Sequence, residues 1–112
     1  MAVSDFAKIS IGTSMLFKWF DATVANQFGA ELARFFMERM PVGTQKNEKK
    51  FAVKTSELLS KLSLRLNQFK GANKLNFYTK AQLANNFKWT LKDAGYEPNY
   101  VDDLTEWLVK QL

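Results

Sequence analysis

The sequence predicts an all-α protein, a compact bundle of four to five helices that forms one domain over residues 1–112. Apolar residues recur at spacings of three and four rather than two, which is the period of a helix. A chain of 112 residues is long enough for one hydrophobic core and too short for two. An aromatic content of 14% without any cysteine indicates a core that forms without disulfides.

The first helix is predicted over about 13–40, and the Pro-Val-Gly segment 41–43 should end it. Its apolar residues occupy two sides of the helical wheel, as in a helix that is central to its bundle or shared with another chain. The pattern leaves open whether Gly12 and Asp21 divide this region into shorter helices. One arc holds Phe17, Val24, Phe28, Leu32, Phe35 and Phe36, and the other holds Met15, Trp19, Ala33 and Met37.

A second helix is predicted over about 47–70, with Gly71 as a left-handed C-terminal cap. Apolar residues on one side of this helix form its predicted core stripe. They are Phe51, Leu58, Leu59, Leu62, Leu66 and Phe69.

The third helix is predicted to begin at Thr79, whose hydroxyl would form a capping box with Gln82, and to end at Gly95. The Thr-Lys-Ala-Gln-Leu-Ala opening is similar to that of a helix-turn-helix, but the helical pattern continues past Ala84 where the turn should lie. We therefore exclude that motif. The predicted core residues are Leu83, Phe87, Leu91 and Ala94.

A fourth helix is predicted from near Asn99, with Asp102 and Asp103 in the first turn, where the helix dipole favours anions. Together with Glu106 these carboxylates lie opposite the apolar side. We interpret them as a solvated helix start rather than a metal site, because cation sites need converging oxygen ligands from more than one turn. The apolar side holds Val101, Leu104, Leu108 and Leu112.

Positive charge is concentrated in the middle of the chain. Residues 46–80 carry nine basic side chains against only Glu48 and Glu57, a net charge of +7, whereas residues 1–45 are neutral and residues 81–112 carry −2. A basic segment between neutral and acidic ones is typical of a protein that binds a polyanion.

The basic residues of the second helix form one strip, because Lys50, Lys54, Lys61 and Arg65 are spaced by four, seven and four. The strip covers about 22 Å at 1.5 Å per residue, enough to follow several phosphates. The alternative is that the lysines only solvate the free side of an amphipathic helix. Lys46, Lys49, Lys70, Lys74 and Lys80 extend the strip into the flanking segments.

Trp89 is the best candidate for stacking on a nucleic-acid base, since it lies off the apolar side of its helix beside Lys88 and Lys92. Phe77 and Tyr78 are weaker candidates. The alternative for Trp89 is burial against a neighbouring helix or another subunit.

The sequence also excludes several classes of function. Without histidine or cysteine the usual activated nucleophiles and bases are missing, so we expect no enzyme, cofactor, metal or small-molecule substrate. The first residues lack the apolar core of a signal peptide, and the most apolar run, 15–20, is interrupted by Lys18. We therefore expect a cytoplasmic protein without membrane contact.

The basic helical face, the all-helical pattern and the apolar residues outside the core stripes resemble the small subunits of multi-subunit CRISPR effector complexes, which serve in antiviral defence. The resemblance covers the whole chain as an architecture, and residues 46–80 and the last two predicted helices carry it. It implies that Lys50, Lys54, Lys61 and Arg65 contact the nucleic-acid backbone without cleaving it.

The function predicted first is therefore sequence-independent binding of RNA or DNA by a subunit of a ribonucleoprotein or other nucleoprotein complex. Its partners would be nucleic acid and other protein subunits, further copies of itself included. The second hypothesis is a protein-interaction adaptor or inhibitor whose basic face meets an acidic protein, with Trp89, Leu64 and Val53 as anchors. Peripheral binding to anionic lipid is a weaker third, because the core needs the apolar stripe.

Overall fold

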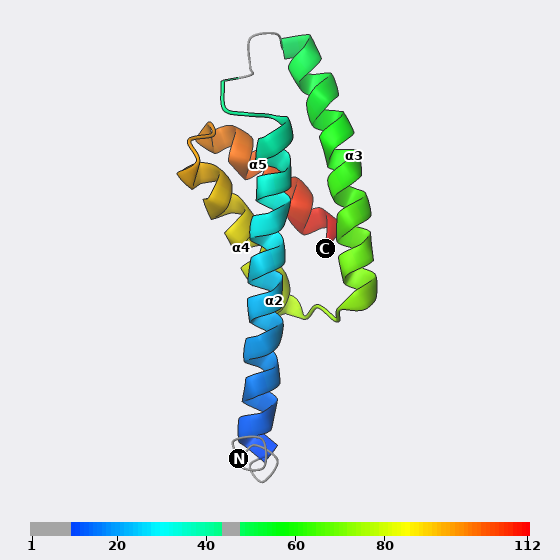
Figure 1. The fold of residues 1–112 in the computed structure, drawn as a ribbon, viewed down its shortest axis with the longest axis vertical. Helices are drawn as coiled ribbons and strands as arrows, with labels where there is room; N and C mark the ends of the chain where they lie inside the picture. The colour runs from blue at the N-terminus through cyan, green and yellow to red at the C-terminus, as the bar shows by residue number, and fades with distance from the viewer. Residues whose placement is uncertain (1–9, 44–47) are drawn as a thin grey trace.

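The computed structural model describes the backbone of residues 10–43 and 48–112 and the side chains of residues 22–43 and 49–112. Within these residues the chain forms helices and no strand, so the predicted all-α bundle is confirmed. The helices are α2 (Ser10–Arg39), α3 (Glu48–Ala72), α4 (Phe77–Asp93) and α5 (Pro98–Gln111). In Figure 1, α2 and α4 run upward, α3 and α5 run downward, and the first turns of α2 extend below the other helices.

The first predicted helix corresponds to α2, which is unbroken, so neither Gly12 nor Asp21 divides it. It ends before the 41–43 segment, as predicted, and Gly43 follows with a φ of 92°, a conformation that glycine adopts without strain. The predicted core residues Met15, Phe17 and Trp19 fall outside the described side chains.

The second predicted helix corresponds to α3, which is longer than expected. The prediction that Gly71 is a left-handed cap is wrong, because Gly71 lies within the helix and has no positive φ. Asn73 closes the last turn instead, with both its backbone N–H and its side-chain amide donating to the carbonyl of Phe69, at 2.9 and 3.1 Å.

The capping box of α4 differs from the predicted one by three residues. Asn76 is the N-cap, and its side-chain oxygen accepts from the Thr79 N–H at 2.8 Å while the Thr79 hydroxyl accepts from the Asn76 N–H at 2.9 Å. Thr79 is therefore the third helical residue and does not pair with Gln82, since asparagine caps as well as threonine does. Phe77 and Tyr78 consequently lie in the first turn of α4 rather than in a loop.

The end of α4 is close to the prediction. The helix continues past Ala84 without a turn, which confirms that there is no helix-turn-helix here, and Gly95 follows it with a φ of 99°. Ala94 is exposed as the C-cap residue, so its predicted place in the core is wrong.

The start of α5 is capped by a glutamate. The carboxylate of Glu97 accepts from the backbone N–H groups of Asn99 and Tyr100, at 3.1 and 2.8 Å. Asp102 and Asp103 lie beyond the first turn, so their predicted placement there is wrong, and Glu97 supplies the anion that the helix start favours.

The core is built from residues of all four described helices, mostly those that the apolar periodicity predicts. Phe51, Leu59 and Phe69 of the predicted α3 stripe are only partly buried, at the edge of the core. The fully packed residues include Leu32, Phe36, Leu58, Leu62, Leu66, Leu83, Phe87, Leu91, Val101, Leu104 and Leu108.

The backbones of α2 and α4 approach closely at Gly29, and we call this contact the α2–α4 seam. A Cβ on Gly29 would overlap the backbone carbonyl of Leu83, so only glycine fits there. Beside this contact, the side-chain amide of Asn86 donates to the side-chain oxygen of Asn26 at 2.9 Å. The seam sets the distance between α2 and α4.

Large side chains hold α3 against the rest of the bundle. The rings of Phe28 and Phe69 stack with centroids 4.0 Å apart, and the hydroxyls of Thr55 and Tyr100 share a hydrogen bond of 2.9 Å. The α4–α5 connection is fixed by Tyr96, whose hydroxyl donates to the carbonyl of Met40 at the end of α2.

Candidate nucleic-acid interface

The basic strip predicted from the sequence lies on the exposed side of α3. Lys50, Lys54, Lys61 and Arg65 are all exposed, and we call these four residues the α3 row. Helical periodicity places the row on the flank of α3 that turns toward α2, because Arg65 reaches the α2 residue Phe35.

Arg65 has a structural role as well as a charge. Its guanidinium carbon lies 3.9 Å from the centroid of the Phe35 ring, and the guanidinium of Arg39 stacks on the same ring at 3.6 Å. Such stacking leaves the edges of a guanidinium free to donate hydrogen bonds. Arg65 therefore fixes one end of the α3 row without losing its charge.

Three cations of the α3 row, Lys54, Lys61 and Arg65, have no acidic partner among the described side chains. Glu57, on the same helix, is exposed, and Glu38 of α2 lies 3.6 Å from Arg39. Unpaired cations on one helix attract an anionic ligand more strongly than paired ones.

Two of the other predicted contacts have partners inside the protein. The Lys70 ammonium donates to the carbonyl of Gln111 at the end of α5, at 2.8 Å, and Lys92 lies 3.0 Å from the Asp102 carboxylate. The Lys70 ammonium has three N–H donors and uses one on this carbonyl, whereas a phosphate at Lys92 would compete with the Asp102 carboxylate.

The remaining lysines predicted beside the α3 row lie in different parts of the chain. Lys49 is exposed near the start of α3, and Lys74 is exposed in the connection to α4. Lys46 falls outside the described residues.

Trp89 lies on the outer side of α4 and is 54% exposed, so no helix of the described bundle buries it. The ammonium groups of Lys88 and Lys92 lie 5.3 and 5.5 Å from the centroid of its ring. An exposed tryptophan between two cations has the components of a base-stacking position.

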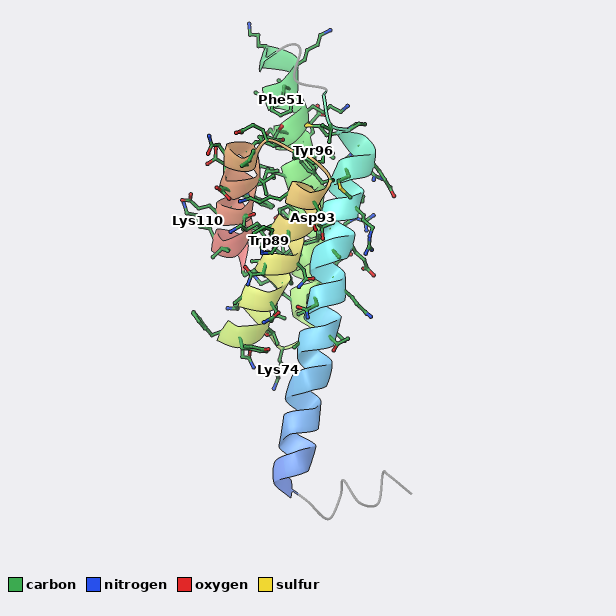
Figure 2. The ribbon with its side chains drawn as sticks, turned by 90° about the vertical axis from the view of Figure 1, so that its left-hand side faces the viewer. Phe51, Lys74, Trp89, Asp93, Tyr96 and Lys110 are labelled. Atoms are coloured by element: carbon green, nitrogen blue, oxygen red, sulfur yellow. The ribbon has the colours of Figure 1, made fainter. Side chains whose placement is uncertain are left out.

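The structure does not bring Trp89 and the α3 row together. In Figure 2, Trp89 faces the viewer from α4, with α5 beside it, whereas α3 lies behind them. Figure 1 agrees, with α3 and α4 on opposite sides of α2. The two parts of the predicted interface are thus separate surfaces, and a short ligand cannot contact both.

Two of the three carboxylates of α5 form ion pairs. Asp102 pairs with Lys92, and Glu106 lies 3.3 Å from Lys110, one turn further on. Among the described side chains, those of residues 22–43 and 49–112, no group of three acidic residues is arranged to hold a metal ion. Nor is any helix of the described backbone long and apolar enough to cross a membrane.

The pattern of single helices did not reveal a groove between α4 and α5. Phe77, Lys80, Ala84, Lys88 and Val109 contribute to its lining, and its volume is about 330 Å³. The signal in the sequence was the capping asparagine, since it places Phe77 on the helix and not in a loop.

Comparison of the chain with models of known families, with curated proteins and with solved structures finds no match. The resemblance to CRISPR small subunits therefore stays a prediction.

Proposed function

We propose that this protein is a non-catalytic subunit that binds the sugar-phosphate backbone of nucleic acid, independently of sequence, within a larger nucleoprotein complex. The observation that carries the proposal is the α3 row, in which Lys54, Lys61 and Arg65 are exposed and have no ion-pair partner among the described residues. The row measures about 22 Å from Lys50 to Arg65 at 1.5 Å per residue.

Sequence independence follows from the chemistry of the row. Lysine ammonium groups are flexible point charges that contact phosphates, whereas reading of base edges requires side chains held in a groove. Each phosphate contact releases bound counterions, so affinity should fall steeply as the salt concentration rises.

The test is a fluorescence-anisotropy titration with single- and double-stranded DNA and RNA at several salt concentrations. We expect K54Q/K61Q to weaken binding about tenfold and to lower the salt slope by about two ions. The control is R34Q/K110Q, which removes the same net charge at exposed positions outside the α3 row; of the two, Lys110 is paired with Glu106.

Two results would contradict the proposal. If both double variants weaken binding equally, net charge alone attracts the ligand and the α3 row is not the site. If the parent protein binds none of the four nucleic acids even at low salt, this chain does not bind nucleic acid as an isolated subunit.

A protein-interaction adaptor is the second candidate function. Val53 and Leu64 are 58% and 65% exposed and lie eleven residues apart, on the same outer line of α3. Exposed apolar side chains beside cations are typical of a contact with an acidic protein. Under this function, V53S/L64S would abolish a partner interaction that survives nuclease treatment, and nucleic-acid binding would not change.

A further inference from the structure

The groove between α4 and α5 is lined by apolar side chains and by two lysines. The apolar residues include Ala81, Ala84 and Phe77 of α4 and Val109 of α5. Phe77 is 90% exposed and Val109 54% exposed, so water covers large apolar side chains on both helices. Burial of this surface by a partner would be favourable.

The cations of the groove are Lys80 and Lys88, both on α4. Among the described residues neither lysine forms an ion pair, and the lining of the groove contains no acidic side chain. The two positions are eight residues apart, which is about 12 Å along the helix axis. Thr105 and Asn85 are the other polar residues of the lining.

We infer that this groove binds an acidic amphipathic helix of a partner subunit. One or two apolar side chains of that helix would enter between Phe77 and Val109. Its carboxylates, placed about two turns apart, would pair with Lys80 and Lys88. Helices commonly bind by laying an apolar face into such a groove.

The spacing of the lysines argues for a polypeptide rather than a small molecule. The backbone positions of the two lysines lie about 12 Å apart along the helix axis, so a single small carboxylate could pair with both only if the two side chains converged on it. A helical peptide with acidic residues seven or eight positions apart matches this distance. Nucleic acid fits less well, because Phe77 is the only aromatic ring in the lining on which a base could stack, and phosphates gain nothing from the aliphatic residues around it.

The groove is separate from the α3 row, and it lies on the α4–α5 side of the protein that Figure 2 turns toward the viewer. Its occupation therefore does not depend on the proposed binding of nucleic acid. A partner bound here would leave α3 accessible on the other side of the molecule.

The experiment uses a synthetic helical peptide with two leucines on one face and glutamates seven positions apart, titrated against the whole protein. We expect K80E/K88E to weaken binding of this acidic peptide at least about tenfold. A second peptide, with lysines in place of the glutamates, should bind K80E/K88E better than it binds the parent protein. The matched control K54E/K61E, with the same change of charge on α3, should bind the acidic peptide much better than K80E/K88E does.

A second pair of variants tests the apolar part of the site. Val109→Ser should weaken binding of the acidic peptide, whereas Val53→Ser, an equally exposed valine on α3, should not. Three outcomes would each overturn the proposal. The first is an equal loss of binding in K80E/K88E and K54E/K61E, the second is an equal loss in the two valine variants, and the third is no binding of the acidic peptide to the parent protein. Single-stranded DNA is titrated in parallel. If K80E/K88E weakens the binding of DNA more than the binding of the acidic peptide, the proposal is also overturned.

Discussion

The α2–α4 seam and the attachment of α3 are packed in opposite ways. At the seam, Gly29 lets the backbone of α2 come into contact with the carbonyl of Leu83. The contacts of α3 instead run through long side chains, such as the stacked rings of Phe28 and Phe69 and the Arg65 guanidinium on Phe35. The α2–α4 seam therefore depends on the absence of a side chain at Gly29, whereas the attachment of α3 depends on large side chains.

This difference separates stability from surface function. Close backbone packing leaves no room for adjustment, so changes at the seam should act on the whole fold. Because α3 meets its neighbours along one side only, the flank next to that side is free to carry Lys54 and Lys61. Variants of the seam should therefore lower stability, and variants of the α3 row should lower binding.

The largest effect is expected at the seam. In Gly29→Ala, the added methyl group overlaps the carbonyl of Leu83, and a backbone cannot yield as a flexible side chain does. We expect a loss of about 3 kcal/mol or more in the free energy of unfolding, measured by urea denaturation.

Gly71→Ala is the matched control for this variant. Gly71 also lies in a helix, but a Cβ there meets nothing within 4 Å. Alanine should stabilise α3 by about 0.5 to 1 kcal/mol, because it restricts the unfolded chain and favours the helix. Equal effects of the two substitutions would show that the seam is not tightly packed.

A smaller and local effect is expected for α3. Phe69→Ala removes one ring of the stacked pair and should cost about 2 kcal/mol, since Phe69 is only partly buried. Amide hydrogen exchange should become faster in α3 while α2, α4 and α5 keep their protection. Phe77→Ala, at an exposed position, is the control, and a uniform loss of protection in Phe69→Ala would contradict the separate attachment of α3.

The smallest effect is expected for two tyrosines. Tyr96, in the α4–α5 connection, bonds to Met40 at the end of α2, and Tyr100, in α5, bonds to Thr55 of α3. Burial raises the pKa of both Tyr96 and Tyr100 above the ordinary value of 10.0, and the nearby Tyr100 raises that of Tyr96 further. The folded protein thus favours the neutral hydroxyls. Their contribution to stability is complete below pH 10.0 and is lost as the pH rises through the raised values.

The test compares the unfolding free energy of the parent and of Tyr100→Phe between pH 8 and pH 11. The variant loses the hydrogen bond with Thr55, so we expect it to be less stable by about 1 kcal/mol at pH 8. The difference should shrink above pH 10.0, because only the parent has this hydroxyl to ionise. A constant difference across this range would show that Tyr100 does not titrate with folding. Lysine titration affects both proteins alike.

Much of the fold was predictable because helices are local. The apolar period of three and four places Leu58, Leu62 and Leu66 in the core, and all three are buried. Errors fell at helix ends, where several residues can serve as caps. Asn76 replaced Thr79 as the cap of α4, and Asn73 closed α3 beyond Gly71.

The candidate site was less predictable, because its parts come from different helices. The spacing in the sequence located the α3 row, and the exposure of Lys54 and Lys61 agrees with it. No periodicity could show that Lys70 reaches the end of α5 or that Lys92 pairs with Asp102. These contacts join residues that lie far apart in the chain or on separate helices.

By itself, the sequence determined the helical class, most of the buried faces and the concentration of charge on α3, since each depends on neighbours within a turn or two. Only the tertiary structure decided that Trp89 lies on a different side from the α3 row and that α4 and α5 leave an apolar groove edged by Lys80 and Lys88. The physical reason is that the way helices cross depends on how residues from different helices pack across the core. The close approach of Gly29 to the backbone of Leu83 is one example.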